Sequence, residues 1–415
     1  MQKTNKNVDS AKSALLFTSL GHFANDGTVF FVPVIIDLLA VNYHVGTELI
    51  TASLVLFYAS MAISANILGS LIDKRNLHAE GMSMGIFALS LGLLLFSIAM
   101  GNFYIPFFML LSSIITGFGA SFYHPTGSSI LQKYYGKDKL GRYLGINGSA
   151  GGIGRALYPA LFFIIALMFQ SHADAIILFG AIGIVFSITI LFGLRKADGS
   201  FEKIKETNSQ MKQRQGVQGK TINFGIILLA IIFLVRSLAF FGIISWIPEY
   251  ISFERGIGAS LSLGTILTLM FSGGIFGQLV FGKLVENHDK RMILVASTII
   301  SAVFMFMYLE TTGFESLTSL LLFGFVNFSG FPIFMSMISD YVPRGATTSS
   351  NALVWNLGGT SGQAIGPLIV GLVIRSSYSN LPLIFEILLA VAIISALMGL
   401  LLPKPRKVSK VNMFG

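Results

Sequence analysis

Two short stretches of this 415-residue chain repeat each other. Residues 151–159 read GGIGRALYP and residues 359–367 read GTSGQAIGP, so that two glycines and a proline recur 208 residues apart. A looser match joins Gly69-Ser-Leu-Ile-Asp73 to Gly282-Lys-Leu-Val-Glu286. A repeat of this length predicts two helical bundles related by a pseudo-two-fold axis, with a binding site between them. The alternative is that Gly and Pro are simply frequent in membrane helices.

The composition around the repeat is that of a membrane protein. Hydrophobic residues make up 53% of the chain and charged residues 11%, and the mean hydropathy is +0.76. A typical soluble domain has roughly 25% charged residues. This balance excludes an ordinary cytosolic enzyme, a disordered protein and a fibrous protein. The chain has no cysteine, which excludes disulfides, zinc-thiolate sites and thiol nucleophiles.

Apolar segments long enough to cross a bilayer occur throughout the chain. A spanning helix needs roughly 20 apolar residues, and none of these segments alternates as a barrel strand does. We therefore expect an all-α membrane protein with twelve transmembrane helices in two pseudo-symmetric six-helix bundles. The predicted spans are 14–39, 48–72, 81–100, 103–131, 141–169 and 174–195, then 222–249, 259–284, 291–309, 316–341, 346–374 and 381–402. The predicted units are an N-terminal bundle (1–195), a hydrophilic cytoplasmic linker (196–221), and a C-terminal bundle with its tail (222–415).

The basic residues indicate the orientation of these spans. Of the 28 Lys and Arg residues, 24 fall in segments on the side of the N-terminus, and two, Arg255 and Arg375, fall on the other side. Cytoplasmic loops carry the excess of Lys and Arg, so both termini are predicted to be cytoplasmic in a multi-pass plasma-membrane protein. The net charge of +9 then follows from topology, and no nucleic-acid partner is expected.

One acidic residue lies near the middle of the first span. Asp26 is about twelve residues into the span, roughly 18 Å along a helix axis, and His22 precedes it by one turn with Asn25 beside them. Buried charge at this depth is costly and usually faces a partner or a wet cavity. A carboxylate and an imidazole at this spacing can share a proton, so Asp26, His22 and Asn25 are the predicted proton-coupling residues. The alternative is a structural polar patch.

Two arginines lie at similar depth, Arg155 in the fifth span and Arg236 in the seventh. Neither can lose its proton, so each needs an acid, backbone carbonyls, water or an anionic ligand. Two fixed positive charges against Asp26 predict a substrate that carries a carboxylate, phosphate or phosphonate. The alternative is a permanent structural bridge between Arg155 and Asp26. Further polar or aromatic residues of the spans are predicted to line the same cavity: His124, Tyr158, Trp246, Asn356 and Gln363.

Several of these motifs carry a family resemblance. Twelve spans in a 6+6 arrangement, a charged central loop and Gly69-x-x-x-Asp73-Lys74-Arg75 resemble the major facilitator superfamily, although Asn76, Leu77 and His78 follow where further basic residues are usual. Three stretches are similar to fosmidomycin-resistance efflux proteins: residues 21–26, 121–125 and the glycine-rich run 145–154. That group often has an acid after its His-Pro pair, where this chain has Thr126.

The resemblance implies a secondary active transporter that works by alternating access. Efflux by proton antiport is the first expectation, and proton symport of an organic anion or sugar is the alternative. A membrane-embedded enzyme would need a nucleophile or metal cluster that the sequence does not offer, so neither an enzyme nor a cofactor or metal is expected. The expected partners are a small-molecule substrate, protons and the lipid bilayer, in a monomer. By resemblance Asp73 is assigned to the inner gate, and Glu286 is its looser match in the second half. The basic residues predicted to take part in the gate are Lys74, Arg75 and Arg142.

Overall fold

The computed structural model describes residues 2–101, 104–135, 137–198, 223–341, 353–375 and 377–404. Every regular element in these ranges is a helix, and twelve helical segments are long and apolar enough to cross a membrane. The all-α class and the twelve spans are therefore confirmed. The predicted linker lies outside the described residues except for 196–198, which belong to the last turn of the sixth span. The division into 1–195, 196–221 and 222–415 stays a prediction.

The helices follow one another in the predicted order. The first six spans are α1 (Gln2–Tyr43), α2 (Thr47–Arg75), α3 (His78–Met100), α4 (Ile105–Ala120) with α5 (Tyr123–Tyr134), α6 (Lys137–Phe169) and α7 (His172–Asp198). The last six are α9 (Phe224–Glu249) with the π-helix η1 (Tyr250–Glu254), α10 (Leu261–Asn287), α11 (Lys290–Glu310), α12 (Gly313–Asn327) with α13 (Gly330–Tyr341), the π-helix η2 (Val354–Thr360) with α15 (Ser361–Ile374), and α16 (Leu381–Gly399) after the one-turn helix η3 (Tyr378–Asn380).

The fourth span of each half is broken at the same place. The sequence predicted 103–131 and 316–341 as continuous, but the first is α4 and α5, and the second is α12 and α13. Ser121 and Ser329, again 208 residues apart, occupy the two breaks, and each hydroxyl donates to a carbonyl three residues earlier. A serine that bonds back to the preceding turn competes with the helical pattern. The repeat therefore includes this interruption.

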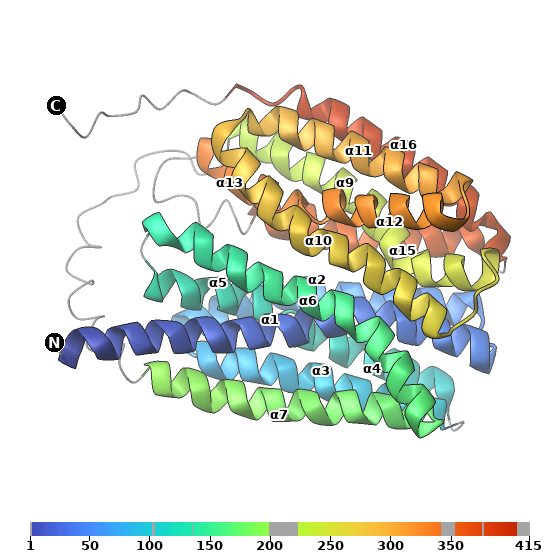
Figure 1. Ribbon diagram of the computed structural model, residues 1–415, viewed down its shortest axis with the longest axis horizontal. Helices are drawn as coiled ribbons and strands as arrows, with labels where there is room; N and C mark the ends of the chain where they lie inside the picture. The colour runs from blue at the N-terminus through green and yellow to red at the C-terminus, as the bar shows by residue number, and fades with distance from the viewer. Residues whose placement is uncertain are drawn as a thin grey trace.

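The two sets of helices lie side by side in Figure 1, blue to green below and yellow to red above. In the first set α1 packs against α6 and α7, and in the second α9 packs against α15 and α16. The sets meet where α6 packs against α10 and α2 against α15. We call the end formed by the connections after α1, η1, α11 and α15 the outer end, following the predicted orientation. The described hydrogen bonds between the sets join Asp37 to Ser252, Thr47 to Arg375, Tyr58 to Ser245, and Ala156 to Thr268.

Glycines in the repeated stretches allow helix backbones to touch. A β-carbon at Gly154 would lie 2.1 Å from the carbonyl oxygen of Phe23 in α1, and one at Gly362 would lie 2.8 Å from that of Leu234 in α9. The spacing of these glycines suggested sliding faces between the halves in both the fifth and eleventh spans. Gly152 does face α10 of the other half, whereas Gly362 packs on α9 within its own half. The glycine pairs of the eleventh span therefore face α9, although α15 itself also packs against α2 of the other half.

Gly154→Ala is expected to lower the free energy of unfolding by about 1–3 kcal/mol, because the new methyl group meets backbone that cannot rotate away. Gly145→Ala in the same helix is the matched control. A β-carbon there meets nothing within 4 Å, so alanine should be neutral or stabilise the helix by up to about 1 kcal/mol. Thermal unfolding in detergent measures both. Equal effects of the two substitutions would refute close packing of α1 on α6.

Candidate functional site

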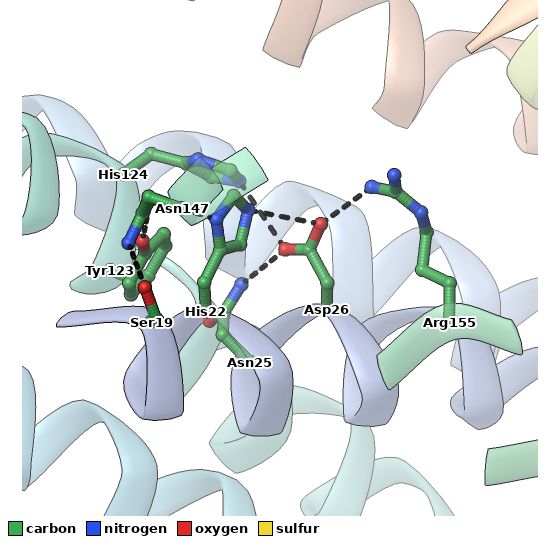
Figure 2. A network of polar contacts seen from close by, with 8 residues as sticks. All are labelled: Ser19, His22, Asn25, Asp26, Tyr123, His124, Asn147 and Arg155. Atoms are coloured by element: carbon green, nitrogen blue, oxygen red, sulfur yellow. Dashed lines mark hydrogen bonds and ion pairs between the residues drawn. The ribbon is translucent and has the colours of Figure 1, made fainter. Parts of the chain in front are cut away.

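A polar cluster centred on Asp26 is formed by side chains of α1, α5 and α6 (Figure 2). Asp26 lies in the middle of α1 and is 3% exposed. Its carboxylate receives side chains from three directions: its own helix, the α4–α5 segment and α6. A buried carboxylate is stable only when it is paired or hydrogen-bonded, so we take the residues that contact Asp26 as the candidate site.

Arg155 forms the strongest contact of the cluster. Its Nη1 atom donates to Oδ2 of Asp26 at 2.6 Å, and both side chains are nearly buried. The glycines at 151 and 154 place α6 directly on α1, which brings residue 155 next to residue 26. Arg155 and Asp26 thus form an ion pair, the contact that the sequence analysis considered as an alternative. Asp26 is therefore paired with a guanidinium that keeps its positive charge at every physiological pH.

His22 lies on the other side of the same carboxylate oxygen. Its Nε2 atom is 3.3 Å from Oδ2 of Asp26, and its Nδ1 atom is 3.0 Å from Oδ1 of Asn147. The amide oxygen of Asn147 also accepts from the Tyr123 hydroxyl at 2.6 Å, so Nδ1 of His22 must donate to it. The Nε2 atom can then bond to the carboxylate only if a proton lies between them. His22 and Asp26 therefore form a pair that can hold one exchangeable proton.

Two further side chains complete the surroundings of Asp26. Asn25 donates to Oδ1 at 3.0 Å, and Nε2 of His124 is 3.8 Å from the same oxygen. The side chain of His124 is 37% exposed, far more than that of Asp26, so it links the buried carboxylate to accessible space. His124 also contacts Trp355 of the other half, with ring centroids 5.5 Å apart. The predicted residues His22, Asn25, Asp26, His124 and Arg155 thus come together in one site.

The guanidinium of Arg155 has donors that the protein does not use. Its Nε and Nη2 atoms are buried and have no hydrogen-bond partner among the described residues. Phe30 of α1 and Phe328 of the α12–α13 break cover the group, with ring centroids 5.3 and 5.2 Å from its central carbon. Phe328 comes from the opposite half. An unpaired buried donor costs about 1–3 kcal/mol, so these two donors are an energetic cost that the described contacts of Arg155 do not offset.

The other predicted arginine lies elsewhere. Arg236 donates to Thr298 and to the backbone and side-chain oxygens of Asn327, each at 3.1 Å, and packs over Phe240. All these residues belong to the second half. The structure therefore places Arg236 inside the packing of that half and does not bring it to Asp26.

The remaining predicted lining residues are distributed over both halves, and Tyr158 lies next to Asp26, because a β-carbon at Gly27 would be 2.5 Å from its ring. Trp246 is fully buried and donates to the carbonyl of Pro367, and Tyr158 packs against Phe31 and Phe179. Gln363 is buried in α15, and Asn356 is half-buried in η2. Of the predicted gate residues, Arg75 and Arg142 are exposed. The side chains of Asp73, Lys74 and Glu286 lie outside the described part of the chain.

Sequence reasoning missed the residues that orient the cluster. Asn147, Tyr123 and Ser19, which receives a hydrogen bond from Asn147 at 3.4 Å, form the layer behind His22. Tyr123 and Asn147 lie within motifs quoted for the resemblance, 121–125 and 145–154, so a signal was present. Their pairing could not be read from the chain, because it depends on how the break at Ser121 turns α5 toward α6.

The fold and this site define a membrane transporter. A model of the Major Facilitator Superfamily matches residues 18–362, and the chain belongs to that superfamily. The inward-open xylose transporter XylE of E. coli superposes with a TM-score of 0.77 at 12% identity, covering 96% of this chain and 98% of that one. A crystal structure of the peptide transporter POT gives 0.70 at 14% identity, covering 93% of both. These likenesses show the fold.

Two relatives are similar in sequence. The hexuronate transporter of Bacillus subtilis is 23% identical over 284 residues, which cover 64% of this chain and 66% of the relative. A glucose-6-phosphate exchanger of Mus musculus is 25% identical over 170 residues, 38% of this chain and 31% of the exchanger. The match therefore spans about a third of the exchanger's length.

Proposed function

We propose that this transporter moves an organic anion together with a proton. The observation that carries the proposal is the arrangement around Arg155. The Nη1 atom of its guanidinium bonds to Asp26, while Nε and Nη2 have no partner among the described residues. A carboxylate or phosphate is the natural ligand for this planar set of donors. Hexuronate carries a carboxylate and glucose 6-phosphate carries a phosphate, so the chemistry of both relatives' substrates fits.

The charges of the cluster determine the sign of the coupling. Without the shared proton, Asp26 and Arg155 neutralise each other. With the proton on His22, the cluster gains one positive charge beside the free donors of Arg155, which favours an anion there. Linkage is reciprocal, so the bound anion must favour the proton equally. An anionic substrate and a proton therefore bind together, as in the symport alternative.

The antiport first expected from the resemblance requires the opposite linkage. A cationic substrate would be repelled by the protonated cluster and would exchange with the proton. The unpartnered donors of Arg155 support the anion instead. The predicted membrane location, cytoplasmic termini, monomeric state and gate residues are retained in the proposal.

Proton uptake on substrate binding tests the proposal. Glucuronate or glucose 6-phosphate is added to the purified protein in weakly buffered solution, and an indicator dye reports the pH of that solution. Symport predicts that about one proton per chain is taken up at saturation. Arg155→Gln serves as the control for protonation of the ligand itself. Proton release would establish antiport, and an absence of binding by any organic anion would overturn the substrate class.

A further inference from the structure

A second group of ionisable residues lies at the outer end, outside the site described above. Asp37 in α1 and Glu249 at the end of α9 are both 0% exposed. One belongs to each half, and the bond from Ser252 to Asp37 brings them together, because Ser252 follows Glu249 by about one helical turn. Two acids buried together across the junction of the halves are an unusual feature for a membrane protein to retain.

Most of the oxygens in this group lack a hydrogen-bond partner. Ser252 donates to Oδ2 of Asp37 at 2.7 Å, which joins η1 to α1. The other oxygen of Asp37, both carboxyl oxygens of Glu249 and the hydroxyl of Tyr378 are buried with no partner among the described residues. No described Lys, Arg or His forms an ion pair with either acid. The group thus has more acceptors than donors, and no described positive charge lies against it.

A proton would correct both deficits. An isolated ionised carboxylate is strongly disfavoured in a buried site, and a second one beside it is disfavoured further. A protonated carboxyl carries no charge and supplies one O–H donor, which the orphaned oxygens can accept. The closed junction therefore requires protons on this pair, whereas water and solvent ions would stabilise the ionised carboxylates once the halves part.

We propose that Asp37 and Glu249 form a proton-binding site shared by the two halves, and that protons bound there hold the outer end closed. The inference rests on alternating access in the proposed function, but not on the nature of the substrate or on the Asp26 cluster. The neighbouring bonds from Thr47 to the carbonyl of Arg375 and between Tyr58 and Ser245 belong to the same closed junction.

The direction of the pH effect follows from linkage. The closed form binds more protons than the open form, so acid favours closure and alkali favours opening. The closed-to-open ratio should change by up to about tenfold per pH unit for each proton bound. Opening toward a less acidic side would release the protons there.

The other ionisable groups of this region are occupied or exposed. Tyr378 stacks on Phe253 of η1, and its hydroxyl is buried. Arg255 donates to the carbonyls of Tyr308, Leu309 and Thr311, and His172 packs on Phe162 and Phe163. Of the other titratable side chains at this end, Tyr43 is half-buried, and Tyr250 and Tyr308 are buried. The charged ones are exposed: His44, Glu48, Asp174, Glu254, Glu310, Glu315, Arg375 and Glu386.

Distance measurements across the outer end test the inference. Because the chain has no cysteine, Asn42→Cys and Asn380→Cys place two spin labels on exposed positions of opposite halves. Pulsed electron resonance on the full chain in lipid nanodiscs then gives the fraction with separated labels between about pH 5 and pH 9. The separated fraction should rise with pH. In Asp37→Asn/Glu249→Gln, which mimics the protonated pair, it should stay low at every pH.

Three controls separate the proposal from its alternatives. The same response should persist in Asp26→Asn, and its loss there would assign the effect to the central cluster while leaving the proposed transport function intact. If Na⁺ closes the outer end at constant pH, and does not do so in the double variant, the pair binds a metal cation. That result would refute the proposal that it binds protons. If the double variant does not fold, Asp37→Asn alone should roughly halve the logarithmic slope. An unchanged slope in either variant, or a wild type without a response, would refute the inference.

Discussion

Asp26→Asn is expected to abolish accumulation of substrate against its gradient. Asparagine cannot exchange a proton with His22, so a pH difference no longer drives movement. For one coupled proton, each pH unit across the membrane supports about tenfold accumulation. The variant should stop at equal concentrations inside and outside. Uptake into proteoliposomes with an imposed pH gradient measures the difference.

The same variant should still exchange labelled for unlabelled substrate, because Arg155 keeps its charge. Asp340→Asn is the matched control, since Asp340 is also ion-paired, to Lys290 at 2.8 Å, but lies far from the site along α13. It should accumulate substrate normally. Gradient-driven accumulation by Asp26→Asn at the wild-type level would eliminate Asp26 as the coupling residue.

Arg155→Gln is expected to weaken anion binding by about 30-fold or more, equivalent to about 2 kcal/mol. Glutamine removes the positive charge and the planar pair of free donors while keeping most of the volume. It also leaves Asp26 without its partner at 2.6 Å, so stability should fall as well. Calorimetric titration with the organic anion gives the affinity, and thermal unfolding gives the stability.

The double variant Asp26→Asn/Arg155→Gln separates the two roles of Arg155. If the residue served only as a structural bridge, removing both charges would restore stability and leave substrate affinity unaffected. If it binds the substrate, stability should recover while affinity stays low. If both stability and substrate affinity recover fully, the Asp26–Arg155 contact has only a structural role.

The sequence predicts the fold well because lipid imposes length and polarity on each span. Hydropathy located all twelve spans, and depth alone selected Asp26 and Arg155 as candidates for one site. Depth could not show that Arg236 is satisfied by Thr298 and Asn327, since those contacts join helices distant in the chain. The breaks at Ser121 and Ser329 were also missed, because serine alone does not end a hydrophobic helix.

The acids at the outer end escaped notice for a related reason. Asp37 and Glu249 fall near the ends of the predicted spans 14–39 and 222–249, where a charged side chain can ordinarily reach water. Only the packing of the second half against α1 encloses them. The sequence therefore identified Asp26, which is buried because it lies mid-way along its helix. It did not identify Asp37 and Glu249, which are buried because the two halves pack together.

The two copies of the repeat differ in a charged residue. Residue 155 corresponds to residue 363 in the second copy, and the arginine of the first copy is a glutamine there. At this pair of positions the first copy therefore supplies a positive charge and the second copy a neutral amide, while Phe328 of the second half covers Arg155 with its ring. If Asp26 and Arg155 couple transport to protons as proposed, substitutions around the second copy can change which substrates fit and leave the coupling residues in place.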